Sequence, residues 1–227
     1  MLKAIIFDFD YTLGDSTNGI AICINYALGK LGYSARNLSD IRRTVGLSLK
    51  DTYAALTFDE NLDKAEKFAK LFIEKADEVM VDNTELYTGV KDVLHKLKVK
   101  GYQTGIVTTK FRYRIEKILN KFDAEELIDI IVGADDVKVE KPNPEGLLWT
   151  VAHLNLRKEN VLYVGDSLVD AKTAENAKVD FAGVLTGTTT KEEFEKHPSV
   201  YIGKDITEIY DFILKLEQSH GTFKKIK

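Results

Sequence analysis

The sequence predicts an α/β protein, a parallel sheet with helices on both faces, into which an all-helical domain is inserted. The sheet is predicted because short apolar runs alternate with segments of helical periodicity from Gly101 onward, and polar residues directly follow those runs. The insertion is predicted because no stretch of residues 16–84 has the pattern of a strand. Parallel strands are joined by crossover helices, so the alternation implies a sheet covered on both sides.

Composition is that of a globular protein and argues against several kinds of partner. The 227 residues are 44% hydrophobic, which suffices for a sizeable core. The formal net charge is −4 with both signs interspersed, so we expect no surface for nucleic acid. No apolar run approaches the roughly 20 residues of a membrane span, and the start lacks the features of a signal peptide. We therefore expect a cytoplasmic protein with no membrane partner. The single cysteine, Cys23, excludes an internal disulfide.

The first predicted strand ends in acid. Four apolar residues, 4–7, run directly into Asp8, and Asp10 follows two positions later. Side chains alternate along a strand, so these two aspartates project to one side while Phe7 and Phe9 project to the other. Two carboxylates in one small space raise each other's pKa unless a cation lies between them, which is typical of proton sharing or metal binding. Taken alone, the stretch also fits a strand that runs out into a polar turn.

Residues 16–84 are predicted to be helical. Apolar residues at helical spacing and cap residues at the ends mark four segments: one from a cap at Asp15 or Ser16 up to Gly32, then Ser39 to Val45, Leu49 to Leu56 after the cap Ser48, and Leu62 to about Met80. This block interrupts the α/β pattern just after its first strand. We therefore predict a discontinuous core of residues 1–15 and 85–227 and a helical cap domain of residues 16–84.

The rest of the chain supplies the other strands and the helices between them. Helices are predicted at Val90 to Leu97, through Ile115 to Leu119, after Pro144, over Ala171 to Ala177 and over Ile206 to Leu216. Strands are predicted at Thr104 to Val107, Ile128 to Val132, Val161 to Val164 and Phe181 to Leu185. The tail from Ser219 to Lys227 has little apolar patterning, and we expect it to be frayed.

Polar residues after these strands are expected to converge, because ligand sites in open parallel sheets lie beyond the carboxyl ends of the strands. The candidates are Asp8 and Asp10 after the first strand, Thr108 and Thr109 after the second, Lys141 beyond the third, and Asp166 with Asp170 after the fourth. Several carboxylates cannot share a pocket unpaired, and oxygen ligands suit a hard cation such as Mg²⁺. A lysine and a hydroxyl beside that cation favour a phosphate ligand. For Thr109 and its neighbour Lys110, a turn that starts the next helix is an equal alternative.

Taken in order, these motifs resemble those of the haloacid dehalogenase superfamily of aspartate-nucleophile phosphohydrolases. The motifs are Asp8-Phe9-Asp10-Tyr11-Thr12, then Thr108 at the end of an apolar strand, Lys141-Pro142, and Gly165-Asp166-Ser167-Leu168-Val169-Asp170. Each motif alone is weak, but the four together are specific. The resemblance covers the whole core and implies a Rossmann-like sheet, with the inserted helices as the cap of the phosphoglycolate-phosphatase-like branch.

The resemblance also implies a role for each residue. Asp8 would be the nucleophile that becomes phosphorylated, and Asp10 the acid that protonates the leaving oxygen and then activates water. Mg²⁺ would be held by Asp8, the backbone carbonyl of Asp10 and Asp166, with Asp170 in or next to that shell. Phosphoryl oxygens would be bound by a further set, Thr108, Thr109 and Lys141.

The implied function is a Mg²⁺-dependent phosphatase of small phosphorylated metabolites, with phosphoglycolate the first substrate to try. A sugar-phosphate mutase or a pyrophosphatase of the same superfamily is the alternative. Two further alternatives, a dehalogenase and a non-catalytic binding protein, fit the residues less well. A dehalogenase needs neither a metal nor a second aspartate such as Asp10, and a binding protein has no need of a complete set of catalytic residues. Selectivity is expected from the cap, which we predict to move as a lid and to read the substrate with the loop Gly46-Leu47-Ser48 and neighbouring Arg43. Many members have glycine where this chain has Tyr11, so the substrates of relatives do not transfer directly.

Overall fold

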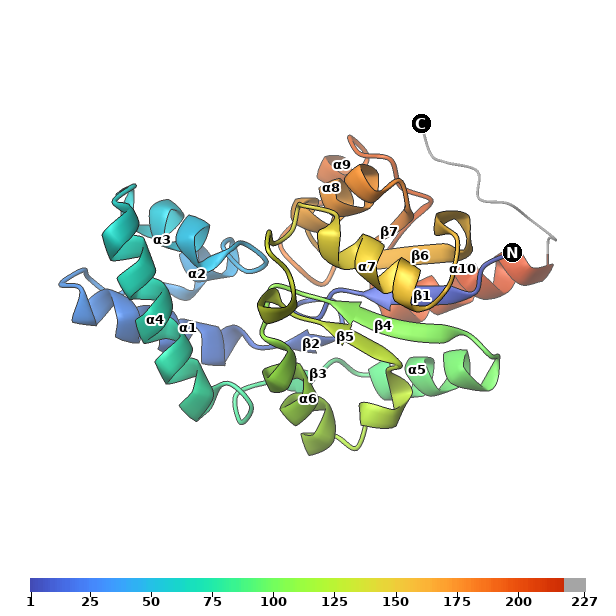
Figure 1. Ribbon diagram of the computed structural model, residues 1–227, viewed down its shortest axis with the longest axis horizontal. Coiled ribbons are helices and arrows are strands. Elements are labelled where there is room, and N and C mark those ends of the chain that lie inside the picture. The colour runs from blue at the N-terminus through green and yellow to red at the C-terminus, as the bar shows by residue number, and fades with distance from the viewer. Residues whose placement is uncertain (219–227) are drawn as a thin grey trace. The chain divides into compact units, whose positions relative to one another are not determined.

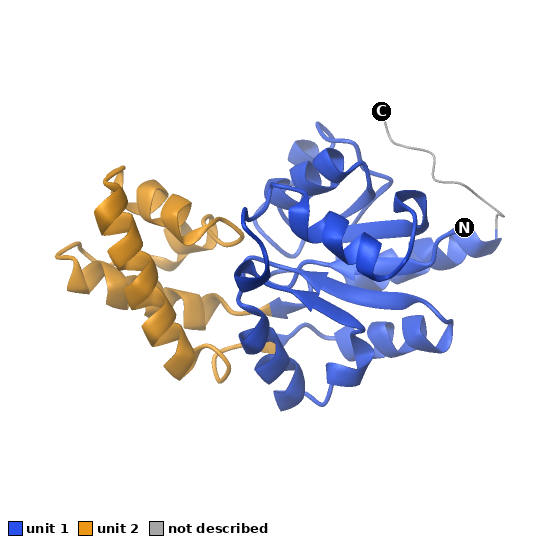
Figure 2. Ribbon diagram, in the orientation of Figure 1, with its two compact units in different colours: residues 1–14, 86–227 blue, residues 15–85 orange. Residues whose placement is uncertain are grey.

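The computed structural model describes residues 1–218, so the expected fraying of Ser219–Lys227 concerns residues outside it. The chain divides into two compact units (Figure 2): residues 1–14 with 86–227, here called the core unit, and residues 15–85, here called the helical unit. The two connections between them are the short strands β2 (Gly14–Asp15) and β3 (Glu85–Leu86), which pair with each other. None of the described helices has the length and apolar character that a membrane crossing requires.

A six-stranded parallel sheet forms the centre of the core unit (Figure 1). Its strands are β1 (Ala4–Phe7), β4 (Gln103–Val107), β5 (Ile130–Val132), β6 (Val161–Gly165), β7 (Asp180–Val184) and β8 (Tyr201–Gly203), in the spatial order β5-β4-β1-β6-β7-β8. This confirms the predicted fold class. The edge strand β8 was not predicted. It has three residues, and its two large side chains, Tyr201 and Ile202, are only half-buried, so they do not form the apolar run that marks a buried strand.

Helices cover both faces of this sheet. On one face α5 (Val90–Val99) packs against α10 (Ile206–Gln218), and on the other α7 (Glu145–His153) packs against α8 (Leu168–Ala177) (Figure 1). The remaining helices are α6 (Arg112–Lys121), which packs on β5, and the single turn α9 (Lys191–Phe194), which was not predicted. Strand β5 begins two residues later than predicted, after a turn of 3₁₀ helix, Glu125–Leu127, and the two residues that follow it.

The strand order reverses at β1, and this reversal fixes where a ligand site can form. From β1 the chain proceeds to β4 and β5 on one side, then crosses to β6, β7 and β8 on the other. The crevice beyond the carboxyl ends of the strands at such a reversal is the usual ligand site in open α/β sheets. The register aligns Phe7 at the end of β1 with Ile106 in β4 and Val164 in β6, so the residues that follow all three strands lie at one edge.

The helical unit consists of α1 (Thr17–Lys30), α2 (Leu38–Arg42), α3 (Leu49–Thr57) and α4 (Leu62–Val79). Both α1 and α3 pack against α4 around a cluster that includes Leu28, Tyr53 and Phe68. The predicted cap at Ser48 is present, since its hydroxyl accepts the N–H of Asp51. Ser16 precedes α1 but makes no side-chain cap. Its hydroxyl pairs with that of Thr84 at 2.9 Å instead.

Candidate active site

Lys141 joins two carboxylates at the carboxyl edge of the sheet. Its ammonium group donates to Asp8 Oδ1 at 2.8 Å and to Asp170 Oδ1 at 2.7 Å, and all three side chains are buried. Asp8 is fixed here because it directly follows β1, where its N–H donates to the carbonyl of Val164 in β6 at 2.8 Å. Lys141 comes from the loop before α7, and Asp170 from the first turn of α8. Three predicted site residues thus meet from three separate stretches of chain.

Asp166 completes an acidic cluster with Asp8 and Asp170. One carboxylate oxygen from each lies within 4.8 Å of the others, so the three could hold a metal ion. Asp166 directly follows β6, the strand next to β1, and the topology therefore places it beside Asp8. Two glycines make room for the cluster, because a Cβ on Gly165 would overlap the Asp170 side chain and one on Gly187 would overlap the Asp166 carboxylate. Gly165 belongs to a predicted motif, whereas Gly187 gave no signal in the sequence.

The cluster has more negative charge than its lysine can compensate. Burial raises the pKa of Asp8 to about 7, although Lys141 lowers it, and Asp170 adds to the rise. Burial also raises the pKa of Asp166 far above its usual range, and Asp170 and Asp8 add to the effect. Burial lowers the pKa of Lys141, but the attraction of Asp170 and Asp8 outweighs it and raises that pKa. A hard cation with oxygen ligands fits this donor set, because it would favour the ionised carboxylates.

Asp170 differs from the other two acids in having both oxygens occupied. Oδ1 accepts from Lys141 and, at 2.9 Å, from the hydroxyl of Tyr163. Oδ2 accepts from the N–H of Ser167 at 3.2 Å and from its hydroxyl at 2.5 Å, which forms a capping box at the start of α8. A carboxylate offers about four lone-pair positions, and these contacts use them. The arrangement favours a place for Asp170 next to a metal's coordination shell, one of the two positions that the sequence left open.

Tyr163 is a site residue that the sequence did not reveal. It lies within the apolar run of β6, where the pattern indicates only a core side chain. Its hydroxyl accepts from Lys141 Nζ at 3.2 Å and lies 3.1 Å from the carbonyl of Val107 in β4. Its ring packs in the core beside Phe181, with 6.3 Å between ring centroids. Tyr163 therefore holds Lys141 and Asp170 from the core side, and the one available signal was a hydroxyl inside an otherwise apolar strand.

Asp10 has a lysine of its own. Its Oδ2 lies 3.1 Å from Nζ of Lys110, and both side chains are buried. The predicted phosphate ligand Thr108 is buried at the end of β4, where its hydroxyl accepts the N–H of Lys110 at 3.2 Å, while Thr109 is half-buried. The sequence left Lys110 open between the start of a helix and a site residue. The structure places it in the site, as the partner of a second carboxylate.

A family model described as haloacid dehalogenase-like hydrolase matches residues 5–184 of this chain. The chain belongs to this family. The matched range contains the acidic cluster and both carboxylate-lysine pairs. The family predicted from the four motifs is therefore confirmed.

Several similar proteins carry phosphatase names. The phosphoglycolate phosphatase of Psychrobacter arcticus is 28% identical over 221 residues, which cover 94% of this chain and 96% of that protein. The phosphoglycolate phosphatase of Cereibacter sphaeroides is 32% identical over 185 residues, which cover 80% of this chain and 84% of that protein. A solved structure from Bacteroides fragilis, described as haloacid dehalogenase-like, has a TM-score of 0.89 at 39% identity and covers 92% of this chain and 100% of its own. The predicted enzyme class, a phosphatase-type hydrolase of the haloacid dehalogenase family, agrees with these findings.

Tyr11 adopts a backbone conformation that glycine takes more readily than other residues. Its φ of 60° lies in the left-handed region, which costs a side-chain-bearing residue roughly 1–2 kcal/mol. The turn holds this conformation with two contacts: the Tyr11 N–H donates to the carbonyl of Gly14 at 2.7 Å, and the hydroxyl of Thr186 donates to the Tyr11 carbonyl. The side chain of Tyr11 is buried, so it fills the core unit at the base of the turn after Asp10.

The three predicted selectivity residues belong to the helical unit of this hydrolase. Arg43 follows α2 and is exposed, and Gly46 has a φ of 91°, which only glycine adopts readily. Ser48 is committed to the helix that it precedes, since its hydroxyl accepts the Asp51 N–H at 3.1 Å and donates to the Asp51 carboxylate at 2.7 Å. Of the two side chains, Arg43 is therefore the one that is free to meet solvent or a ligand.

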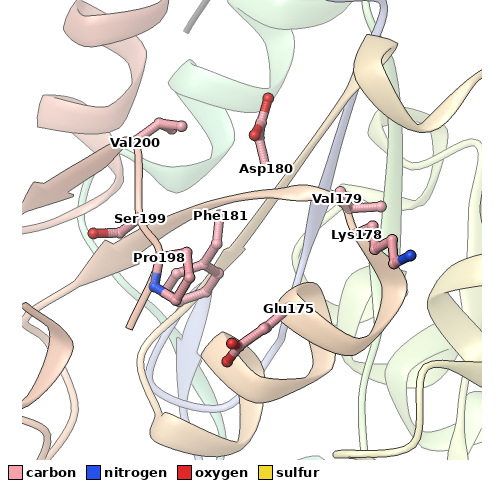
Figure 3. Close-up of a pocket in the computed structure, with 8 residues that line it drawn as sticks. All are labelled: Glu175, Lys178, Val179, Asp180, Phe181, Pro198, Ser199 and Val200. Atoms are coloured by element: carbon pink, nitrogen blue, oxygen red, sulfur yellow. The ribbon is translucent and has the colours of Figure 1, made fainter. Parts of the chain in front are cut away.

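A separate pocket of about 240 Å³ lies at the other edge of the sheet (Figure 3). It is lined by Glu175, Lys178, Val179, Asp180, Phe181, Pro198, Ser199 and Val200. Asp180 begins β7 and Val200 directly precedes β8, so this pocket lies at the amino ends of strands whose carboxyl ends point toward the acidic cluster. It is not part of the candidate active site.

Proposed function

We propose that this hydrolase is a Mg²⁺-dependent phosphatase that acts on small phosphorylated metabolites through an aspartyl-phosphate on Asp8. The observation that carries the proposal is the buried contact of Lys141 with Asp8, beside the carboxylate of Asp166. A carboxylate next to a lysine and a cation site can approach a phosphate that would otherwise repel it. Burying such charges costs stability, so folding alone gives no reason to keep them together.

The first half of the reaction forms a bond between a carboxylate oxygen of Asp8 and phosphorus, and breaks the bond from phosphorus to the leaving oxygen. Asp10 donates a proton to that oxygen, so the product departs as an alcohol. Lys141 and Thr108, with Thr109 as a further donor, hold the phosphoryl oxygens. Thr108 follows β4, which is paired with β1, so it lies at the same strand edge as Asp8.

In the second half Asp10 accepts a proton from water, the water oxygen attacks phosphorus, and Asp8 is released with phosphate. When bound, Mg²⁺ supplies positive charge that reduces the repulsion between Asp8 and the phosphate. Its ligands would be Asp8, the backbone carbonyl of Asp10 and Asp166, while Asp170 orients Lys141 from outside that shell. The pKa of about 7 for Asp8 agrees with the need for a cation, because the nucleophile must be ionised.

Phosphoglycolate is the first candidate substrate, because the relatives from Psychrobacter arcticus and Cereibacter sphaeroides are named for its hydrolysis. Those relatives are 28% and 32% identical to this chain, which supports the reaction type more strongly than the particular metabolite. The cytoplasmic location and the absence of nucleic-acid and membrane partners stay predictions from the sequence.

We also propose that the helical unit serves as the cap of this enzyme and selects its substrate. The unit is inserted directly after the turn that follows Asp10, so one of its two connections begins close in sequence to the proposed catalytic residues. Its exposed Arg43 and the glycine turn at Gly46 supply a charge and a backbone suited to contact with an anionic ligand.

A panel of phosphorylated compounds tests the proposed function. The panel contains phosphoglycolate, hexose phosphates, pyrophosphate and an aryl phosphate, each assayed for phosphate release with Mg²⁺ and with excess chelator. We expect Mg²⁺-dependent release that is suppressed by chelator and is greatest with one small phosphorylated metabolite. Full activity in chelator would remove the metal from the proposal, and no release from any compound would remove the phosphatase activity itself.

A further inference from the structure

Lys110 lies in the site but has no part in the reaction described above. Its N–H is fixed by the hydroxyl of Thr108, and its side chain is buried, with Nζ 3.1 Å from Oδ2 of Asp10. A lysine side chain loses much conformational freedom and most of its hydration when it is buried. Such burial calls for partners that compensate the charge.

The two buried lysines differ in how completely they are paired. The ammonium of Lys141 has three acceptors, Asp8, Asp170 and the hydroxyl of Tyr163, which match its three N–H donors. Within residues 1–218, Lys110 is paired through its ammonium group with Asp10 alone. Asp10 is also incompletely paired, since its Oδ1 is buried without a hydrogen-bond partner among the described residues. Donors of Lys110 and an acceptor of Asp10 therefore remain available at one place.

The position of this place relative to the reaction follows from the two pairs. Asp8 is the nucleophile of the proposed function, so its partner Lys141 lies beside the attacking oxygen. Asp10 faces the leaving oxygen in the same proposal, so its partner Lys110 lies near the leaving group. We propose that Lys110 binds a negatively charged group on the leaving part of the substrate, and that the site thereby favours phosphate compounds whose leaving group is itself an anion. This inference rests on the proposed function, and it specifies in addition that the leaving group of the substrate is negatively charged.

The shared chemistry is an anion that reaches the ammonium of Lys110 while its phosphoryl group meets Asp8. A carboxylate on a small hydroxy acid and the second phosphate of pyrophosphate both meet this description. Once Asp10 has protonated the leaving oxygen, its Oδ1 would accept a hydrogen bond from the departing hydroxyl, beside the same lysine. A lysine that served only to hold Asp10 in place would show no preference for charge on the leaving group.

Two substrates of nearly equal size separate these roles. Phosphoglycolate has a charged leaving group, and its neutral amide has the same shape without the charge. We expect the wild-type enzyme to prefer phosphoglycolate, and Lys110→Met to lower kcat/KM for phosphoglycolate roughly 10- to 100-fold more than for the amide, the range of one lost charge-assisted hydrogen bond. A parallel assay with pyrophosphate shows whether the anion that Lys110 prefers is a carboxylate or a phosphate.

Three controls keep the inference open to refutation. Lys172→Met removes an exposed lysine of α8 and should leave the ratio of the two substrates unchanged. Lys110→Arg keeps the positive charge and should keep the preference for phosphoglycolate over its amide. This variant tests the inference if circular dichroism shows that Lys110→Met does not fold. Equal losses on both substrates, or no preference in the wild type, would overturn the inference. If the wild type hydrolyses no phosphate compound at all, the proposed function fails first, and that outcome is visible in the aryl phosphate assay.

Discussion

Among the described residues, the core unit buries charged side chains in addition to hydroxyls, whereas the helical unit buries no charged side chain. The core unit buries aspartates and lysines together at the carboxyl edge of its sheet, where Asp8, Asp10 and Asp166 meet Lys110 and Lys141. In the helical unit, the buried polar side chains other than tyrosine are serines and threonines. Hydroxyls are satisfied by local hydrogen bonds, whereas buried charges need each other or a ligand. The difference indicates that the core edge is kept for chemistry, and that the interior of the helical unit is kept for folding.

The pKa values of Asp8 in the acidic cluster and of Asp59 in the helical unit are shifted in opposite directions. Burial raises the pKa of Asp8 in the core unit, with Asp170 adding to the rise. In the helical unit, hydrogen bonds from Tyr33 and Lys64 lower the pKa of Asp59, which is part of a tyrosine and lysine network. An acid with a raised pKa opposes folding when ionised, and an acid with a lowered pKa supports it. Substitutions in the two units should therefore be read by different measurements.

The largest effect is expected from Asp8→Asn. The amide cannot attack phosphorus, so we expect turnover of an aryl phosphate with Mg²⁺ to fall about 10³-fold or more. The matched control is Asp63→Asn, an exposed acid of α4 in the helical unit, which should keep its activity. A sizeable residual activity in Asp8→Asn, with the protein folded, would contradict covalent catalysis and with it the contrast between the two units.

The sequence predicted most elements of both units, since their helices have strong apolar periodicity and marked ends. Ser48 before α3 and Gly32 after α1 are cap signals that the structure confirms. The elements that were missed are short ones, β8 and α9 among them. The strand β8 and helix α9 are too short for their pattern to stand out, and β8 is held by its pairing with β7 rather than by its own sequence.

The site was predictable where a residue directly follows a strand, because strand order then fixes its neighbours. Asp8 and Asp166 are of this kind. Tyr163 and Gly187 were not predictable, because their roles depend on contacts across the sheet: a hydroxyl that reaches Lys141 and a missing Cβ that admits Asp166. Such contacts have no local periodicity or spacing in the sequence.

A second prediction concerns pH and metal. The ordinary pKa of an aspartate is 3.8, and the pKa of Asp8 in the folded chain without metal is about 7. Between these two pH values Asp8 holds a proton in the folded state that it has lost in the unfolded state. The free energy of unfolding should therefore fall as pH rises from about 4 to about 7, by up to about 1.4 kcal/mol per pH unit for one such group. A cation that replaces the proton should stabilise the protein more at pH 8 than at pH 5.

Thermal unfolding at those two pH values, with Mg²⁺ and with chelator, measures this effect. Acids with lowered pKa, such as Asp59 and Glu217, lose their stabilising effect only as pH falls toward and below their ordinary range, so they contribute little between pH 5 and 8. Asp8→Asn should flatten the pH dependence of the metal-free protein. Stability profiles with the same pH dependence in Mg²⁺ and in chelator would show that the acidic cluster does not hold the cation.

A pair of glycine substitutions sharpens the comparison further. In Gly187→Ala the new Cβ would overlap the Asp166 carboxylate, so we expect kcat/KM to fall roughly 10- to 100-fold, as for other small displacements of catalytic groups. In Gly29→Ala, near the end of α1, the new Cβ meets nothing within 4 Å, so the helical unit should gain roughly 0.5–1 kcal/mol. Urea unfolding and steady-state kinetics on both variants test this. An active Gly187→Ala would show that Asp166 tolerates displacement.

The smallest effect is expected at the proposed selectivity loop, where Arg43 and Ser48 should separate. Ser48→Ala removes the cap of α3 and should cost about 1 kcal/mol of stability with the ranking of substrates unchanged. Arg43→Ala removes an exposed charge and should change the relative kcat/KM among phosphorylated metabolites up to about fivefold, since an exposed ion contact contributes at most ~1 kcal/mol. Hydrolysis of a small aryl phosphate serves as the reference for both variants. If Arg43→Ala affected all substrates and the aryl phosphate alike, the loop would not be the selector. The helical unit would then act on the reaction through its fold alone, and the charge of Lys110 in the core unit would be the remaining source of selectivity.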